Sequence, residues 1–444
     1  MNPAFELDRG RLRSVVSSRR WILTAGIALN TIFWIVRIAV EWSTLGMFYV
    51  VGVDWSRFWG AARAFVVVGP KSGYDLNAIA HFMQPFLLYY SDNINSVALK
   101  VGPAPYPPIF LALFAPFTIP PPQIGFLLWT IANLLIAIPV ARSLAGHFPA
   151  DQQRAVTTLL LLFFPLMMAL FVGQMVIILL FAFWKAYQAL EQGDDFRAGL
   201  WLGVLLIKPQ YAVVLLAVLL LKRRYWAIGG SALTALAVLL SSLLVGGVDG
   251  VVAYVRMILV DYPNYSGGLA IDPQSMISWR ALVLNLIPNV GKTEGLVLTA
   301  LLSLISLVML AVIWRGEWNP RSPRFANQML ATMIVSLLVA YHSQVHGAVL
   351  LMVPGALIAA GSPSSPFIKK LILVSVFGPP FATLLSLIIQ GNAGMVSLLY
   401  LPLMIMALIA ILKYDWTFGA RAGLLGPPVP SIVAAGNDTE PWRR

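Results

Sequence analysis

Residues 21–39 read WILTAGIALNTIFWIVRIA and form the first long apolar run of the chain. A helix needs about 20 apolar residues to cross the ~30 Å hydrocarbon core of a bilayer, and this run meets that length. Five arginines precede it and no small-x-small cleavage site follows it, the arginines being Arg9, Arg11, Arg13, Arg19 and Arg20. We therefore expect an uncleaved signal anchor rather than a removed signal peptide.

The composition indicates that the rest of the chain is suited to a membrane as well. Hydrophobic residues make up 59% of the 444 positions and charged residues only 11%, whereas about 25% of residues are charged in soluble globular proteins. The sequence predicts an all-α polytopic membrane protein. It contains no cysteine, so disulfides, thiolate metal sites and thiol catalysis are excluded.

Apolar segments of spanning length recur along the chain. Scanning for them predicts twelve spans, near residues 21–40, 105–120, 123–142, 155–172, 174–191, 198–221, 225–246, 294–314, 327–341, 345–361, 368–389 and 395–412. Within 143–195 the short segments could instead pair as a half-membrane hairpin. An even number of spans places both termini on one side of the membrane.

The basic residues indicate which side that is. The net charge is +12, but the Lys and Arg residues fall in short loops beside apolar segments, which argues against a nucleic-acid partner. With the N-terminus inside, cytoplasmic segments hold 17 of these residues and outer loops hold ten. This asymmetry predicts that both termini are cytoplasmic.

Two outer segments are then large, one from about 41 to 104 and one from about 246 to 293. In the first, apolar residues from Trp55 to Val66 recur at three- and four-residue spacing, which predicts an amphipathic helix lying in the membrane interface. A second helix is expected at 77–90. We expect a single domain over 1–421 and a disordered cytoplasmic tail over 422–444.

Asp54 is the candidate for chemistry, because it is an acid placed just after the first span. It lies in the stretch DWSRFWGAAR, residues 54–63. A carboxylate there could act as a general base on a hydroxyl group. The alternative is structural: Asp54 could cap the following helix, with Arg57 as its i,i+3 partner.

Lys208 and two histidines are further candidates. Lys208 falls inside the predicted span 198–221, where a charge costs about 2.5–3.5 kcal/mol, so it could hold a lipid phosphate, snorkel or pair within the bundle. His342 and His346 flank a predicted outer turn with Gln344 between them. They could form a metal pair, be ordinary turn residues or hydrogen-bond a substrate, but no third ligand lies nearby, and we predict no metal and no cofactor.

Other polar residues remain open between binding and structure. Asp75 is a secondary acid or a helix cap. Outer cations could hold a phosphate or only contact lipid headgroups; they are Arg57, Arg63, Lys100, Arg256 and Arg280. Gln174 and Gln210 lie in apolar surroundings and could bind substrate or pair across helices.

The order of these motifs resembles glycosyltransferase family 87. The motifs are Asp54 to Arg63, then Gly73-Tyr74-Asp75, Tyr106-Pro107-Pro108, Gly173-Gln174 and Lys208-Pro209-Gln210. The resemblance covers the first half of the chain by motif and the rest by topology. It implies a GT-C-type helical bundle, a membrane mannosyltransferase that uses a polyprenyl-phosphate sugar, and Asp54 as the catalytic base.

The resemblance implies a reaction on the outer face of a bacterial cytoplasmic membrane. A hexose, most simply mannose, would pass from the polyprenyl-phosphate donor to a hydroxyl of a glycolipid or glycan acceptor, with inversion. Two other classes stay open: a transporter or flippase of lipid-linked saccharides, and an O-antigen-type polymerase or ligase. The first would show paired, repeat-related broken helices; the second would place its large outer loop late in the chain.

Overall fold

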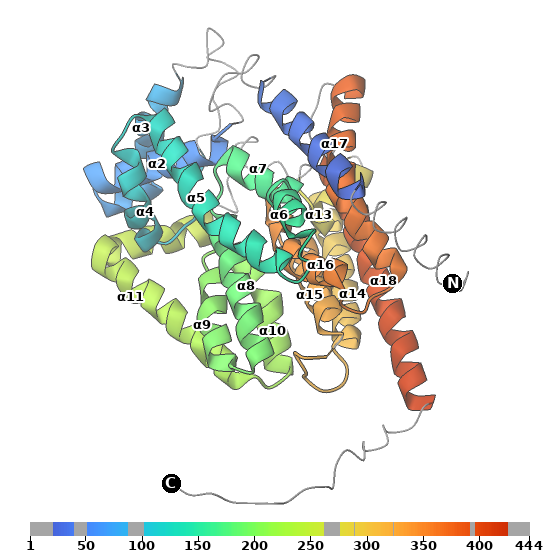
Figure 1. Ribbon diagram of the computed structural model, residues 1–444. Coiled ribbons are helices and arrows are strands. Elements are labelled where there is room, and N and C mark those ends of the chain that lie inside the picture. The colour runs from blue at the N-terminus through green and yellow to red at the C-terminus, as the bar shows by residue number, and fades with distance from the viewer. Residues whose placement is uncertain are drawn as a thin grey trace, which may run out of the picture.

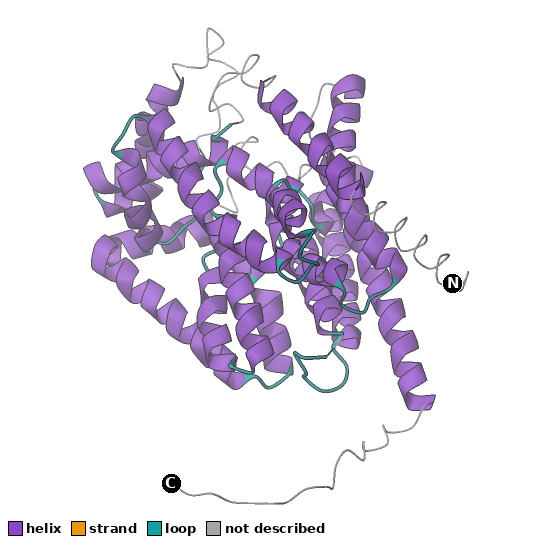
Figure 2. Cartoon of the chain, in the orientation of Figure 1, coloured by secondary structure: helices purple, strands orange, loops and turns teal. Residues whose placement is uncertain are grey.

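The protein is a bundle of helices (Figure 1). Its computed structural model describes residues 21–39, 51–87, 102–261, 276–287, 289–322, 324–390 and 396–424. Over these ranges the chain forms helices and connecting turns and no strand (Figure 2). The prediction of an all-helical chain is therefore confirmed for the described residues. The five N-terminal arginines, Lys100 and the tail from 425 onward lie outside them, as do parts of both predicted outer segments.

Several helices are long and apolar enough to cross a membrane. Among the described residues four meet this test, Trp21–Ala39, α5 (Pro122–Ala145), α11 with its π-helical extension (Tyr225–Asp261) and α14 (Lys292–Ile313). A fifth crossing is possible if the bent pair α6 (Gln153–Leu161) and α7 (Phe164–Val172) counts as one span. The protein is thus a multi-pass membrane protein, but twelve separate spans are not reproduced.

The remaining helices are shorter or only partly described. Those before α11 are α2 (Val53–Val67), η1 (Pro70–Tyr74), α3 (Leu76–Leu87), α4 (Pro108–Phe114), η2 (Ala115–Thr118), α8 (Val176–Gln192), α9 (Asp195–Leu205), η3 (Pro209–Tyr211) and α10 (Val213–Leu221). Those after it are η4 (Met257–Asp261), α13 (Trp279–Leu286), α15 (Phe325–Val339), η6 (Val345–Leu351), α16 (Met352–Ala360), α17 (Pro366–Gln390) and α18 (Val396–Leu424).

The segment 198–221 does not cross the molecule once, as the sequence predicted. It consists of α9 and α10 on either side of a break at Lys208-Pro209, and proline removes a backbone donor at such a break. Asp195 at the start of α9 forms an ion pair with Arg224, just after α10. Both ends of the segment therefore lie at one end of the molecule. The predicted single span is wrong, because apolar length alone does not distinguish one crossing from a hairpin that returns.

Two turns between helices lie at the other end of the molecule from the end that the sequence predicted for them. Gln174 follows a turn assigned to the cytoplasm, yet its side chain bonds that of Asp54, which was assigned outside. The turn after α8, assigned outside, contacts a loop assigned to the cytoplasm: Arg321 Nε donates to the carbonyl of Glu191 at 3.2 Å. We call these the Asp54 end and the opposite end of the molecule. Lys222 also lies at the opposite end, where its Nζ donates to the carbonyl of Gly316 at 2.7 Å.

The helices that directly follow the first span in the described residues, α2 and α4, pack against each other in protein. The apolar face of α2, predicted to lie in the membrane interface, has Trp55 at 0% exposure, and only Val66 among its predicted stripe is exposed. The segment 105–120 forms an apolar helix over Pro108–Thr118 that is too short for a crossing. It packs against α2, with Phe114 in ring contact with Phe58 at 5.9 Å. The helix predicted at 77–90 is present as α3.

Small residues bring α9 and α11 close together. A Cβ on Gly199 would overlap the backbone of Ala227, and Ser231 Oγ donates to the carbonyl of Gly199 at 3.0 Å. Close helix packing of this kind is typical of membrane proteins. Helices in lipid gain no hydrophobic free energy by associating, so van der Waals contacts and hydrogen bonds between them hold them together. α11 then kinks at Gly247 (φ 62°, ψ −177°), where the sequence predicted the span to end.

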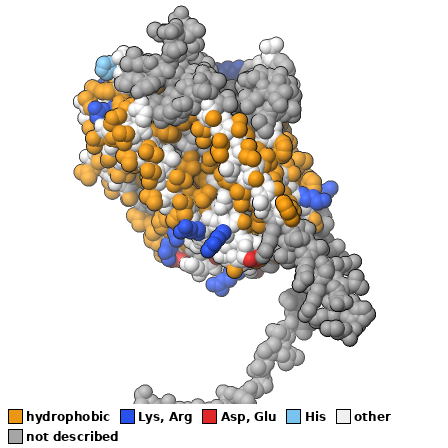
Figure 3. All heavy atoms as spheres, turned by 45° about the horizontal axis from the view of Figure 1, so that its top comes forward, with side chains coloured by type: hydrophobic (Ala, Val, Ile, Leu, Met, Phe, Trp, Pro, Cys, Tyr) orange, Lys and Arg blue, Asp and Glu red, His pale blue; other side chains and the backbone are white. Residues whose placement is uncertain are grey.

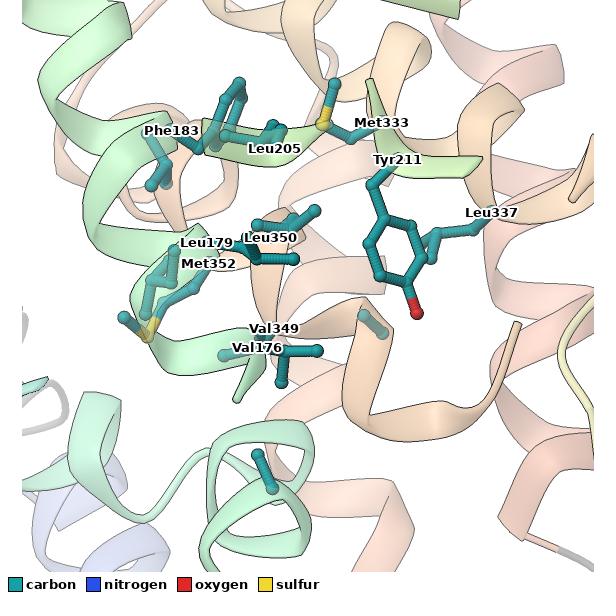
Figure 4. Packing of buried hydrophobic residues seen from close by; sticks show 14 of the residues in the cluster. Val176, Leu179, Phe183, Leu205, Tyr211, Met333, Leu337, Val349, Leu350 and Met352 are labelled. Atoms are coloured by element: carbon teal, nitrogen blue, oxygen red, sulfur yellow. The ribbon is translucent and has the colours of Figure 1, made fainter. Parts of the chain in front are cut away.

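The core fills the space between α8, α9, α15 and η6. Side chains from all four meet there, including Val176, Leu205, Met333 and Val349 (Figure 4). The surface of the molecule is apolar as well. Figure 3 shows a broad hydrophobic area with Lys and Arg side chains near its lower edge. An apolar belt bordered by cations is the surface expected of a protein that sits in a bilayer.

Candidate functional site

Asp54 lies in the first turn of α2, two residues after the position that caps the helix. The capping residue is Gly52, which has a left-handed conformation (φ 73°) and whose N–H donates to the carbonyl of Phe171 at 2.7 Å. The capping explanation for Asp54 is therefore wrong, although its predicted i,i+3 pair with Arg57 is confirmed at 3.2 Å. The carboxylate is therefore held by side chains and does not cap the helix.

Gln174 brings the end of α7 against this carboxylate. Its Nε2 donates to Asp54 Oδ2 at 2.7 Å. The preceding Gly173 ends α7 in the left-handed region (φ 78°), and a Cβ there would overlap Trp55. Trp129 Nε1 donates to the Gly173 carbonyl at 3.0 Å, so this turn is anchored on both sides.

Lys208 reaches the same group from the break between α9 and α10. Its Nζ donates to Gln174 Oε1 at 2.7 Å and lies 5.6 Å from the centre of the Tyr106 ring. The Tyr106 hydroxyl also donates to Gln174 Oε1, at 3.4 Å. The buried lysine is thus paired within the bundle, at the apex of a hairpin that carries it to the Asp54 end.

Positive charges surround His342 in the turn between α15 and η6. Burial, together with the charges of Lys208, Arg57 and Arg280, lowers the pKa of His342 to about 3. The imidazole is therefore neutral near pH 7, with one ring nitrogen as donor and one as acceptor. Arg280, near the start of α13, stacks on Tyr341 at 4.2 Å, and its buried Nη1 has no hydrogen-bond partner within the described part of the chain.

The other residues of this turn lie at different depths. His346 is 5% exposed within η6, beneath the turn. Gln210 Nε2 donates to the carbonyl of His342 at 3.5 Å, which ties the apex after Lys208 to the turn. Gln344 precedes η6, and its carbonyl accepts the N–H of Gly347 at 2.8 Å. Lys208 acts electrostatically on both histidines, whereas Arg57 and Arg280 act on His342.

Three predicted site residues have structural partners elsewhere. Asp75 is exposed and its Oδ1 accepts the N–H of Asn77 at 2.8 Å, as a cap of α3. Arg63 stacks on Trp59 at 5.8 Å, two turns along α2 from Asp54. Arg256 forms an exposed 3.8 Å ion pair with Asp261. None of the three contacts the Asp54 carboxylate.

Some residues of the site were not singled out from the sequence. Trp129 anchors the Gly173 turn. The hydroxyls of Ser278 and Ser343 are buried and have no hydrogen-bond partner among the described residues, close to where the N–H of Ile277 donates to the carbonyl of Ser343 at 2.8 Å. A tryptophan within an apolar helix and serines in short loops carry no distinguishing pattern. No group of three or more His, Asp or Glu side chains gathers as metal ligands in the described part of the chain.

Comparison with known proteins gives one result. The profile of glycosyltransferase family 87 matches residues 105–340, which is more than half of the chain. The match includes Tyr106, Gln174, Lys208 and Arg280, whereas His342 lies just after it and Asp54 lies well before it. No curated protein and no solved structure matches the sequence. The chain belongs to glycosyltransferase family 87 and is a membrane glycosyltransferase.

Proposed function

We propose that the protein transfers a hexose, most simply mannose, from a polyprenyl-phosphate donor to a hydroxyl group of a glycolipid or glycan acceptor. The observation that supports this is the placement of one carboxylate beside two cations. Asp54 pairs with Arg57 and is linked to Lys208 through Gln174, and both cations, together with Arg280, act electrostatically on His342. The cluster carries an excess of positive charge beside a base.

This charge fits the change that the reaction brings. A sugar linked to a lipid phosphate has one negative charge on that phosphate, and release of the sugar leaves a phosphate monoester with a charge of about −1.5 to −2 at pH 7. Charge therefore grows on the phosphate in the transition state, where fixed cations stabilise it most. Arg57, Lys208 and Arg280 are placed to accept it, and arginine suits phosphate oxygens in particular.

Asp54 supplies the base for a single displacement. The acceptor oxygen attacks the anomeric carbon, its proton passes to the Asp54 carboxylate, and the bond from that carbon to the phosphate oxygen breaks with its electron pair on the phosphate. The configuration inverts in one step. Neutral His342 can hydrogen-bond a sugar hydroxyl without adding charge, with His346 and Gln344 supporting the turn.

The corrected connections support an outward-facing site. Arg197 follows the turn after α8, so it joins Lys222 and Arg321 at the opposite end, which enriches that end in cations. Basic residues accumulate on the cytoplasmic side. We therefore place the Asp54 end on the outer face of a bacterial cytoplasmic membrane, with both termini inside. Membership of a glycosyltransferase family favours bond chemistry over the transporter or flippase alternative.

The test is a transfer assay with purified protein, radiolabelled polyprenyl-phosphate mannose and a panel of glycolipid acceptors. We expect Asp54→Asn to lower kcat by about 100-fold or more, because general-base catalysis contributes about 10²–10⁴-fold. Asp75→Asn is the matched control, since Asp75 is an acid near the same helix but only caps α3. Equal turnover by wild type and Asp54→Asn would remove Asp54 as the base.

A further inference from the structure

The side chain of Gln174 lies between the two charged residues at the centre of the site. It donates to Asp54 Oδ2 at 2.7 Å and accepts from Lys208 Nζ at 2.7 Å. Lys208 therefore donates its hydrogen bond to an amide, and that amide in turn donates to the carboxylate of Asp54. Gln174 is 7% exposed, whereas the Asp54 side chain is 18% exposed.

The chemistry of the neighbours fixes which way the amide points. An ammonium group can only donate hydrogen bonds and a carboxylate can only accept them. The amide oxygen must therefore face Lys208 and the amide nitrogen must face Asp54. The Tyr106 hydroxyl donates to the same amide oxygen at 3.4 Å, which uses the second acceptor position of that oxygen.

This arrangement holds the carboxylate from both sides. Arg57 Nη1 contacts Oδ1 at 3.2 Å and Gln174 Nε2 contacts Oδ2 at 2.7 Å. Each oxygen keeps a further lone pair, so the carboxylate can still take a proton. Because the lysine acts through the amide, its charge strengthens the amide hydrogen bond by polarisation without forming a contact ion pair with the base.

The backbone beside Gln174 is rigid as well. Gly173 is in the left-handed region and lies against Trp55, the residue next to Asp54 in α2. The N–H of Gln174 donates to the carbonyl of Ala169 at 2.8 Å, which closes the end of α7. A shift of the carboxylate would have to move this turn, so the amide is set in place before any substrate arrives.

We propose that Gln174 is a positioning residue rather than a substrate-binding one: its amide links Lys208 to Asp54 and holds the carboxylate in the orientation that accepts the proton. This inference rests on the proposed function of Asp54 as the base. It changes the role that the sequence suggested for Gln174. The amide oxygen already accepts from Lys208 and Tyr106, and one of the two amide hydrogens is committed to Asp54.

The kinetic test compares Gln174→Met, which is close in size and makes no such hydrogen bonds, with Gln174→Asn. We expect Gln174→Met to lower kcat by about 10- to 100-fold with KM for donor and acceptor within about twofold of wild type, as for other residues that orient a reacting group. Gln174→Asn keeps an amide on a side chain that is one methylene shorter. Its kcat should fall between those of wild type and Gln174→Met. A raised KM with kcat retained would show substrate binding and overturn the proposal, and so would wild-type kinetics.

A matched control checks that loss of any glutamine does not cause the effect. Gln153 donates its amide to the carbonyl of Phe148 at 3.1 Å, at the start of α6 and apart from this network. Gln153→Met should keep wild-type kcat and KM. Loss of activity in Gln153→Met equal to that in Gln174→Met would reduce the role of Gln174 to general packing and overturn the proposal.

A second measurement does not depend on the reaction. If wild type transfers no sugar from any donor, the proposed function fails, and thermal unfolding of the purified protein then tests the link alone. Gln174→Met and Lys208→Met remove the two partners of one hydrogen bond, so their effects on Tm should be non-additive in the double variant. Additive effects would show that the amide does not couple the two residues and would overturn the proposal.

Discussion

His342 lies beside three positive charges, and this setting makes the protein sensitive to acid. The pKa of this histidine is lowered from its ordinary value of 6.5 to about 3, first by burial and then by Lys208, Arg57 and Arg280. Below pH 6.5 the unfolded chain binds a proton that the folded protein excludes. Folding stability attributable to His342 therefore decreases as the pH falls from about 6.5 to about 3.

We expect His342→Gln to weaken this dependence. The variant should lose less Tm than wild type between pH 7 and pH 4, because glutamine does not titrate. Thermal unfolding of detergent-purified protein at several pH values measures the difference. His81→Gln is the control, since His81 is exposed on α3, and it should keep the wild-type slope. Parallel curves for wild type and His342→Gln would contradict the assignment.

The residues of the site were predictable from the sequence more readily than their contacts. Asp54 stood out as an acid after a span, and Lys208 as a charge in an apolar segment. What joins them is Gln174, 120 residues after Asp54 and 34 before Lys208. A glutamine in an apolar stretch has many possible partners, and only the folded arrangement of α2, α7 and the α9–α10 break selects these two.

At the scale of elements, the site is built from helix ends and breaks. Asp54 begins α2, Gln174 follows α7, Lys208 lies between α9 and α10, and His342 lies between α15 and η6. Backbone groups are left without helical partners at such points, which is how irregular backbone inside a membrane protein comes to line a cavity. The signals were present in the sequence as Gly173 and Pro209, but they mark a break without giving the direction of the chain after it.

Cysteine labelling tests the hairpin formed by α9 and α10. The chain has no cysteine, so single substitutions report without background. Arg197→Cys and Arg223→Cys are both exposed positions, one near each end of the segment. We expect both to react with an impermeant maleimide from the same side of sealed vesicles, because Asp195 and Arg224 are paired.

A third position provides the comparison. Lys71 is exposed in η1, which follows α2 in the chain, and Lys71→Cys should react from the other side. Labelling of Arg197→Cys and Arg223→Cys from opposite sides would show that segment 198–221 crosses the membrane once, and it would contradict the hairpin. The experiment also tests the proposed orientation, since intact cells admit the reagent only from outside.

At the scale of the whole molecule, the class of the protein followed from composition, but the number of crossings did not. The low charge content and the apolar runs predicted a helical membrane protein, and the structure agrees for its described residues. Twelve spans are not reproduced among the described residues, because apolar segments such as 105–120 form helices too short to cross and bury several of their side chains in protein. Hydropathy measures the preference of a side chain to leave water. It does not distinguish a side chain buried in protein from one that faces lipid.

The lipid-facing surface yields a further prediction. Leu301 lies midway along α14 and is 51% exposed on an apolar helix. Leu301→Arg should impair membrane insertion, since an arginine at the centre of a span costs about 2.5–3.5 kcal/mol. The fraction of protein recovered in membranes measures the effect. Thr293→Arg is the control, because Thr293 lies at the exposed start of the same helix, and it should be recovered in membranes like wild type. Recovery of Leu301→Arg equal to that of wild type would argue against α14 facing lipid.

The length of α8 has a consequence for the membrane that the enzyme can use. This helix of 17 residues connects the opposite end to the turn that carries Gln174, and at 1.5 Å per residue it is about 25 Å long. A hydrocarbon core of ~30 Å is thicker than that, so in the orientation proposed above the candidate reacting groups would lie several ångströms below the outer headgroups. A thinner bilayer brings the headgroups down to the level of Asp54. The rate of sugar transfer should therefore depend on the acyl-chain length of the surrounding lipids and fall as those chains lengthen.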